Sequence, residues 1–253
     1  MASASCELAV RSIAVGSHAG GNPGRHPGAG AGDRRITCGD RGVADTQVSH
    51  EGASVNRSRV NELHYLTPIA NIPSITERGI LSHSLARRYE HISVANQSVQ
   101  AQRSRVRLPN NRHLHSYVNL YFDARNPMMY TMKQRHESLA VLRVDPRVLE
   151  LPGVMISDGN AAAGLTRFSP PNDEGFAVID EDSVFAIYWN HADPQVKEEQ
   201  KRKRCAEVLV PDRIPPEFIT GAYVSCQSAK DVIIAANCGI LPRILERLFF
   251  RGA

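Results

Sequence analysis

The sequence predicts an α+β protein, because short apolar strands outnumber helices and do not alternate with them in a regular order. Hydrophobic residues make up 42% of the 253 residues and charged residues 22%, which is ordinary globular usage and allows a sizeable core. Runs rich in β-branched and aromatic residues predict strands at 63–66, 117–122, 139–144, 154–157, 206–210 and 222–225.

Helices are expected between and after these strands. Asn71 or Ser74 can cap a helix that runs to about Glu77, and Gly79 would end it. Pro127 can open a short helix, since its missing N–H costs nothing in the first turn. Polar or amphipathic patterns predict further helices within 85–105, 160–165, 231–237 and 242–248.

The first 55 residues differ in composition from the rest. They hold ten of the 18 glycines and few large apolar residues that could offset the entropy of ordering the chain. The sequence therefore predicts a disordered or low-complexity extension over 1–55, followed by one globular domain over 56–253.

Several classes of protein are disfavoured by composition. No stretch approaches the roughly 20 apolar residues that a membrane helix needs. The five cysteines contain no CxxC pair and suggest neither a disulfide framework nor a zinc site, so a reducing cytoplasm fits best. No His, Cys and carboxylate set has metal-ligand spacing, and no glycine-rich dinucleotide fingerprint follows a strand. We therefore expect no metal and no doubly wound sheet.

Basic residues are clustered, although the net charge is only +4. One cluster consists of Arg103, Arg105, Arg107 and Arg112, and the other of Lys197, Lys201, Arg202, Lys203 and Arg204. A single run of this kind usually marks a solvated face. Two runs that flank a candidate active site favour contact with phosphates.

That candidate site centres on Glu207, which begins a strand whose next residues are Val208, Leu209 and Val210. A carboxylate at the start of a buried strand needs a partner, because burying it unpaired is expensive. The alternative is a surface glutamate on an edge strand.

Five segments together resemble the DarT family of DNA ADP-ribosyltransferases, over about residues 62–226. They are HYLT at 64–67, QAQRSR at 100–105, LHSYVNLYFDARNPMMY at 114–130, SDGNAAA at 157–163 and RCAEVLV at 204–210. The third segment is long enough to be specific, and the order and spacing of all five agree with the family.

The resemblance implies an ADP-ribosyltransferase fold of split, mostly antiparallel sheets with flanking helices, and NAD as co-substrate in the cleft. It implies that Glu207 and Arg103 are catalytic. A carboxylate can hold the ribose 2′-hydroxyl and stabilise positive charge that develops on C1, and the same group could deprotonate the attacking base. A guanidinium can hold anionic oxygens in a fixed fork. Helix solubility or DNA-backbone contact is the alternative role for Arg103.

Further NAD contacts are implied at His64, Tyr65, Leu66, Tyr121 and Met128, with Arg103 beside the pyrophosphate or the target base. Packing in the core is the alternative for His64, Tyr121 and Met128. The family often has Thr two positions after the histidine, where this chain has Leu66, so a side-chain hydroxyl contact at that position is in doubt.

The expected DNA contacts come from several segments. Tyr188 and Trp189 lie in the long acidic connection over 170–194, and could grip a base by stacking; core burial is the alternative for Trp189. The other candidates are Arg105, Arg107, His115, Tyr117, Asn119, Arg125, Lys201, Arg202 and Lys203.

The resemblance therefore implies an NAD-dependent enzyme that modifies guanosine or thymidine in single-stranded DNA, the toxin of a pair whose antitoxin is a macrodomain protein of the DarG type. Asn119-Leu120 and the ending Leu248-Phe249-Phe250 depart from thymidine-directed members, which favours guanosine. Two alternatives stay open: a transferase of the same superfamily that acts on RNA or protein, and a nucleic-acid-binding module without catalysis.

Overall fold

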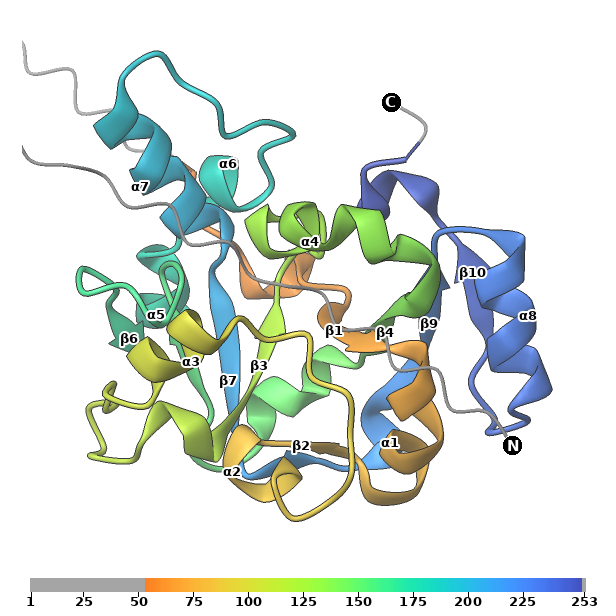
Figure 1. The fold of residues 1–253 in the computed structure, drawn as a ribbon. Helices are drawn as coiled ribbons and strands as arrows, with labels where there is room; N and C mark the ends of the chain where they lie inside the picture. Colours follow the sequence, from red (N-terminus) through yellow and green to blue (C-terminus); the bar gives the residue numbers. More distant parts are fainter. Residues whose placement is uncertain (1–52, 252–253) are drawn as a thin grey trace, which may run out of the picture. The chain divides into compact units, whose positions relative to one another are not determined.

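Eight strands form the main sheet of the computed structural model, which describes residues 53–251 (Figure 1). Their order is β10-β9-β4-β1-β3-β7-β5-β6. All neighbouring pairs are antiparallel except β9 and β10, which confirms a mostly antiparallel α+β fold. The strands are β1 (Leu63–Pro68), β3 (Tyr117–Tyr121), β4 (Leu139–Val144), β5 (Met155–Ser157), β6 (Phe168–Ser169), β7 (Glu207–Pro211), β9 (Ile219–Val224) and β10 (Pro242–Ile244). A separate two-stranded sheet pairs β2 (Ile80–Leu81) with β8 (Arg213–Ile214).

The main sheet is split between β1 and β3. These two strands share a single paired position, His64 with Tyr121, whereas β1 pairs with β4 from Leu63 to Pro68. One half therefore consists of β10, β9, β4 and β1, and the other of β3, β7, β5 and β6. The split expected for this fold is present.

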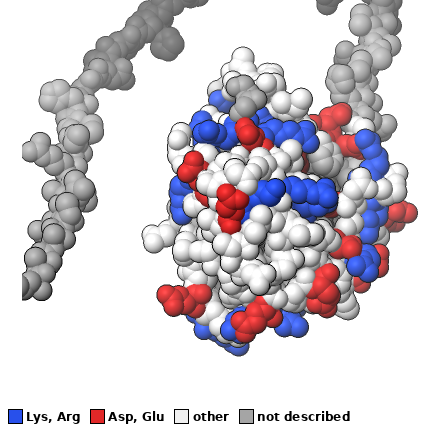
Figure 2. All heavy atoms as spheres, turned by 90° about the vertical axis from the view of Figure 1, so that its right-hand side faces the viewer, with Lys and Arg blue, Asp and Glu red and all other residues white. Residues whose placement is uncertain are grey.

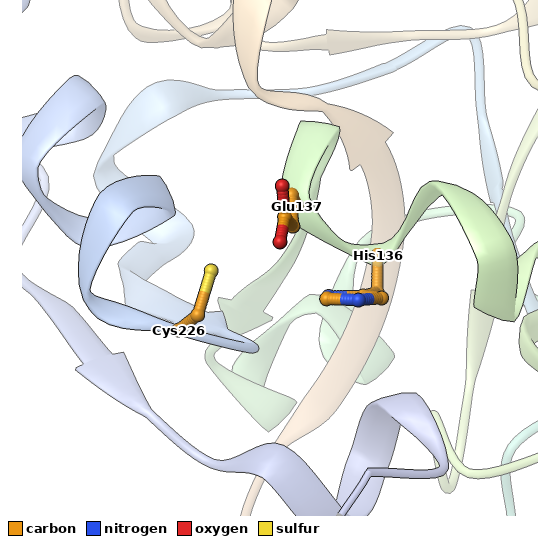
Figure 3. Close-up of side chains that lie close together, drawn as sticks. All are labelled: His136, Glu137 and Cys226. Atoms are coloured by element: carbon orange, nitrogen blue, oxygen red, sulfur yellow. The ribbon is translucent and has the colours of Figure 1, made fainter.

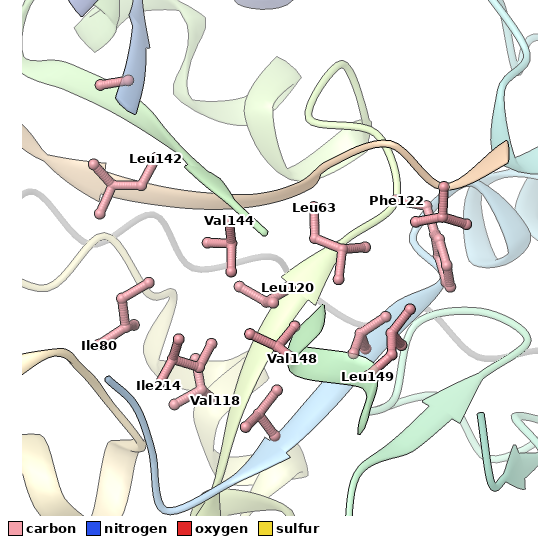
Figure 4. Close-up of a cluster of buried hydrophobic side chains, with 14 of the residues drawn as sticks. Leu63, Ile80, Val118, Leu120, Phe122, Leu142, Val144, Val148, Leu149 and Ile214 are labelled. Carbon is pink, nitrogen blue, oxygen red and sulfur yellow. The ribbon is translucent and has the colours of Figure 1, made fainter. Parts of the chain in front are cut away.

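The core fills the space between the two halves. Leu63, Leu142 and Val144 come from the first half, and Val118 and Leu120 from the second; all are at most 2% exposed (Figure 4). These side chains alternate along their strands with residues of the other face, as the two-residue period of a strand requires. On the other face, Leu66 of β1 packs against a second buried cluster that includes Met129 and Val141, and Tyr117 of β3 belongs to a third cluster with Leu114.

Eight α-helices flank the sheets: α1 (Ile72–Arg78), α2 (His83–Ala86), α3 (Gln97–Arg103), α4 (Pro127–Met132), α5 (Asp173–Ala177), α6 (Glu181–Val184), α7 (Pro194–Arg204) and α8 (Gln227–Ala235), within residues 53–251. Short 3₁₀ segments lie at Arg57–Arg59, Ile69–Asn71, Leu114–Ser116, Lys133–Ser138, Pro146–Glu150, Pro216–Phe218 and Glu246–Phe249. Gly79, at φ 82°, ends α1 as predicted. Asn126 caps α4 by accepting a hydrogen bond from the N–H of Met129.

Three predicted helices are wrong in whole or in part. Within 85–105 only the end of α2 and all of α3 are helical. Residues 160–165 form turns, because side-chain oxygens of Asn160 and Glu207 accept the N–H groups of Ala162 and Ala161. Residues 242–244 form β10, because pairing with β9 satisfies their backbone better than a lone helical turn.

The predicted extension over 1–55 lies mostly outside the described residues. Within the described part, Val55 is 3% exposed and its N–H donates to the Ile179 carbonyl at 3.0 Å, so the ordered core includes this residue. No helix over 53–251 is long and apolar enough to cross a membrane.

Candidate active site

Glu207 begins β7, a central strand paired with β3 and β5. It lies opposite Tyr121 on one neighbour and Ser157 on the other. Because both flanking strands cover it, Glu207 is 1% exposed. The structure thus excludes the alternative of a surface glutamate on an edge strand.

Arg103 and Glu207 form a buried two-point ion pair. Nη1 of Arg103 donates to Oε1 of Glu207 at 3.1 Å and Nη2 donates to Oε2 at 3.0 Å. Burial disfavours the charged form of Arg103, but the charge and hydrogen bonds of Glu207 outweigh it and raise the arginine's pKa. The two residues predicted to be catalytic, 104 positions apart, are therefore in direct contact.

The turn after β5 completes the surroundings of Glu207. The backbone N–H of Ala161 donates to Oε1 at 2.9 Å, and Ser157 Oγ accepts from the N–H of Glu207 at 3.1 Å. Arg202, from α7, fixes this turn by donating to Asp158 at 2.9 Å. Burial alone would raise the pKa of Asp158, but hydrogen bonds from Arg202 and Arg167 hold it below its ordinary value. Glu207 is thus held in one orientation.

A cavity of about 400 Å³ lies against this ion pair, between β1, β3, α3 and the loop before α3. Of the predicted NAD contacts, Arg103 lines it together with Tyr65, Leu66, Tyr121 and Met128. Of the predicted DNA contacts, His115, Tyr117 and Asn119 line it. Two neighbouring faces of the split sheet thus bring residues from distant segments to one cavity.

His64 does not line this cavity. Residues alternate along β1, so the ring of His64 lies on the other face from Tyr65 and Thr67. Its nitrogens contact the Phe122 carbonyl and Oε1 of Glu62, each at 3.2 Å. His64 is thus a buried histidine with both ring nitrogens engaged, and its contact with NAD stays a prediction.

The sequence reasoning missed a loop clamp on the cavity. Asn71, considered only as a helix cap, donates to the Ile92 carbonyl at 2.8 Å and accepts from the Ile92 N–H at 3.0 Å. This pairing holds the loop 91–96 beside the cavity that it lines. An Asn near a strand end carries no sequence signal for such a distant contact.

A histidine pair was missed in the same way. The rings of His83 and His115 lie 4.2 Å apart and both line the cavity. Burial and the neighbouring positive charges, Arg87 and Arg103 among them, lower the pKa of both rings. Both are therefore favoured in the neutral form. His83 lies in a short helix that the sequence patterns did not distinguish.

Four residues of the basic run on α7, from Lys201 to Arg204, form ion pairs. Lys201 pairs with Glu198 at 2.6 Å, and Lys203 with Asp180 at 2.9 Å. Arg202 pairs with Glu199 as well as Asp158. By contrast, Arg105 and Arg107 are exposed and form no ion pair with the described residues. Arg105 and Arg107 are therefore more readily available to contact phosphates than the residues of the α7 run.

Trp189 lies in an aromatic cluster with Tyr130 and Phe250, whose ring centroids are 6.1 and 5.8 Å from its own. Arg125 lies over the Phe250 ring at 4.1 Å. Tyr188, the residue before Trp189, is 78% exposed. Trp189 itself is half-buried by this cluster, which is less burial than a core residue has and leaves part of the ring open for stacking on a base.

One group of possible metal ligands occurs in the part of the chain that the structure describes: His136, Glu137 and Cys226 (Figure 3). The ring of His136 is already engaged, with Nδ1 2.8 Å from Ser225 Oγ and Nε2 3.1 Å from Nη1 of Arg251. The guanidinium of Arg251 also places a positive charge where a cation would have to bind. This group therefore has the character of a hydrogen-bond network.

The face that carries α8 and β10 shows Lys, Arg, Asp and Glu scattered among uncharged residues (Figure 2). No single-sign field covers it, so it offers no obvious platform for a polyanion.

Comparison with known proteins places these features in a family. A family model described as "ssDNA thymidine ADP-ribosyltransferase, DarT" matches residues 64–245. A DNA ADP-ribosyl transferase–DNA ADP-ribosyl glycohydrolase fusion protein of Thermosipho africanus is 33% identical over 203 residues, which cover 76% of this chain. The chain spans about half the length of that relative, 50%.

Solved structures share the fold. Thermus sp. 2.9 DarT in complex with ADP-ribosylated ssDNA matches with a TM-score of 0.67 and 23% identity, over 78% of this chain and 99% of that one. The same protein in complex with NAD+ matches with a TM-score of 0.62 and 22% identity, over 75% and 98%.

Proposed function

This chain belongs to the DarT family of ADP-ribosyltransferases, and we propose that it transfers ADP-ribose from NAD to a base of single-stranded DNA and releases nicotinamide. The observation that carries the proposal is the ion pair between Arg103 and Glu207, held beside a cavity in the split of the sheet. Each of the five segments on which the family resemblance rests contributes residues to this cavity.

Glu207 supplies the charge stabilisation. When the nicotinamide–ribose bond breaks, positive charge develops on C1 of the ribose, and a fixed carboxylate that accepts the 2′-hydroxyl proton in a hydrogen bond stabilises it. The same carboxylate can then take a proton from the attacking base. The N–H groups of Ala161 and Glu207, held by fixed partners, keep the carboxylate in place throughout.

Arg103 must turn before this can happen. It engages both carboxylate oxygens of Glu207, which is 1% exposed, and so covers them from the cavity. The diphosphate of NAD offers the guanidinium a second fork of anionic oxygens. Arg103 therefore exchanges Glu207 for the diphosphate as NAD enters, and frees the carboxylate for the ribose.

The cavity has the size and lining for NAD. Its volume of about 400 Å³ lies within the range of roughly 300–1,000 Å³ that is common for small-molecule sites. Tyr121 and Met128 offer apolar surface to the nicotinamide ring, and Tyr65 and Leu66 line the β1 side. The protein would work in the cytoplasm, where NAD and DNA are available and its cysteines stay reduced.

The acceptor is an unpaired base, because a duplex would bury the reacting atom. Tyr188 and Trp189 would stack on it, while Arg105, Arg107 and Arg125 contact phosphates. We favour guanosine because of Asn119-Leu120 and the Phe-rich ending, whereas the family description names thymidine. Oligonucleotides that lack all G or all T decide between them, since only a strand with the target base gains mass.

The protein would act as a toxin whose antitoxin is a macrodomain protein of the DarG type that removes the modification. The Thermosipho africanus relative, named as a fusion of a DNA ADP-ribosyl transferase with a DNA ADP-ribosyl glycohydrolase, supports this pairing.

Mass spectrometry of a short single-stranded oligonucleotide, incubated with NAD and the protein, tests the activity. We expect the mass of one ADP-ribosyl group on DNA, none on RNA of the same sequence or on protein, and none with Glu207→Gln. That variant keeps the side-chain shape and removes its charge, and should slow transfer by about 100-fold or more. Transfer by the variant at the wild-type rate, or modification of RNA alone, would contradict the proposal.

A further inference from the structure

Arg204, the last residue of α7, is a buried arginine whose side chain donates hydrogen bonds to two segments that are far apart in the sequence. Its side chain is 1% exposed. Nε donates to the Ala186 carbonyl at 2.9 Å, and Nη1 donates to the Val184 carbonyl. On the other side, Nη2 donates to Asp123 Oδ2 at 2.8 Å and to the Arg125 carbonyl at 2.5 Å.

The two segments that Arg204 joins carry predicted DNA contacts. Residues 184–186 run from the last residue of α6 toward Tyr188 and Trp189, while residues 123–125 lie between β3 and α4 and include Arg125. In Figure 1 the ends of α6 and α7 lie next to each other. Outside Arg204 the segments meet again, since Arg125 lies over Phe250 and Phe250 contacts Trp189.

We propose that Arg204 is a positioning residue that fixes the DNA-binding side of the site. The inference rests on the proposed function. The sequence placed Arg204 in a basic cluster that was expected to contact phosphates. In the structure its guanidinium instead forms its hydrogen bonds inside the protein. Only a guanidinium can do this, because its planar fork reaches acceptors on two sides at once, whereas an ammonium is a single point charge.

The arrangement also divides the site into two sides. Arg204 contacts the segments of Tyr188, Trp189 and Arg125, but it makes no hydrogen bond to the residues that line the cavity from β1 or α3. Loss of its fork should therefore loosen the grip on DNA and spare the NAD side. A merely structural role would lower both together.

Arg204→Lys tests this in the full chain. We expect the KM for a single-stranded oligonucleotide to rise by at least about tenfold, since a displacement of about 1 Å can cost more than that. The KM for NAD, and the slow release of nicotinamide without DNA, should stay within about twofold of wild type. Arg147→Lys is the matched control, because Arg147 is exposed and forms its ion pair with Asp145, two residues earlier and outside the site.

Hydrogen exchange provides a readout that needs no substrate. Backbone amides of 184–190 and 123–126 should exchange faster in Arg204→Lys than in wild type. In Arg147→Lys their exchange rates should equal those of wild type. If Arg204→Lys does not fold, Asp123→Asn can replace it, because it removes the charge of one acceptor of Arg204. This variant should raise the KM for the oligonucleotide and the exchange rates by less than Arg204→Lys, and leave the KM for NAD unchanged. Equal changes in both KM values, or unchanged exchange, would overturn the proposal. A wild-type protein that leaves DNA unmodified would refute the proposed function, while the exchange measurement would still decide the anchoring.

Discussion

At the scale of single residues, the site depends on geometry that charge alone does not provide. Arg103 meets both oxygens of Glu207 at 3.1 and 3.0 Å in parallel hydrogen bonds. Such a fork fixes orientation as well as charge, and the same fork matches a diphosphate. A positive charge of another shape in this place should therefore bind NAD poorly.

Arg103→Lys isolates this effect, because it keeps the charge and removes the fork. We expect kcat/KM for NAD to fall by about tenfold or more, a loss of roughly 1.4 kcal/mol in transition-state stabilisation. Steady-state kinetics with saturating oligonucleotide measure it, with Arg147→Lys as the same change at an exposed site. Unchanged kcat/KM would show that charge alone suffices at position 103.

Glu62, the residue before β1, offers a second prediction at this scale. Hydrogen bonds from His64, Arg143 and Tyr223, opposed in part by burial, lower its pKa to about 2 from an ordinary value of 4.5. A depressed carboxyl pKa stabilises the fold above the unfolded value, and this contribution is lost as the pH falls from about 4.5 toward 2.

Glu62→Gln should therefore lower the free energy of unfolding at neutral pH and reduce its decline between pH 4.5 and 2. Denaturant unfolding at several pH values measures this, with Glu150→Gln as a control whose side chain is 72% exposed. Equal pH dependence in Glu62→Gln and wild type would contradict it.

At the scale of elements, the sequence predicted strands better than helices. Strands at 139–144 and 117–122 came close to the observed bounds because their apolar runs are buried by the sheet itself. The helices at 160–165 and 242–248 failed because distant partners, the carboxylate of Glu207 and the edge of β9, took their backbone groups. Local propensity is a weak prior against such contacts.

The candidate site divides in the same way. Arg103 and Glu207 could be found from motifs, because the chemistry requires those residue types. Asn71 and His83 could not, since their partners Ile92 and His115 lie far along the chain and only the fold brings them together. For the α7 run the sequence shows the charges but not their partners: Lys201, Arg202 and Lys203 each form an ion pair with a carboxylate, and their contact with DNA stays a prediction.

The two basic clusters should therefore differ in how they bind DNA. Replacing both Arg105 and Arg107 by Gln should reduce the slope of log affinity against log salt by about 1.4, if each contacts one phosphate of a single strand at about 0.7. Lys201→Gln should change it less, because Glu198 already pairs with that lysine. Oligonucleotide binding measured across salt concentrations tests both. A larger slope change for Lys201→Gln would reverse the assignment.

At the scale of the whole molecule, the split between β1 and β3 explains why one domain can hold a deep site. A continuous sheet would pair β1 with β3 along its length and close the space where Tyr65, Asn119 and Tyr121 face the cavity. With one paired position left, the halves stay joined by the core of Leu63, Val118 and Leu120. The shared core thus holds the two halves together, and the split between them leaves room for the cavity.

This architecture predicts where the domain can be shortened. Val55 and Val60, 3% and 6% exposed, pack into the shared core, and the N–H of Val55 also donates to the carbonyl of Ile179 in the connection over 170–194. A chain that starts at Ala53 should keep its activity and melting temperature.

A chain that starts at Asn61 loses both valines, at about 1.5–3 kcal/mol each if fully buried. Its melting temperature should fall by about 6 °C or more, because each kcal/mol corresponds to about 2–4 °C in a domain of this size. Calorimetry and oligonucleotide modification compare the two chains directly. Equal stability would place the start of the core after Val60, and loss of activity in the longer chain would show that residues before Ala53 take part in the reaction.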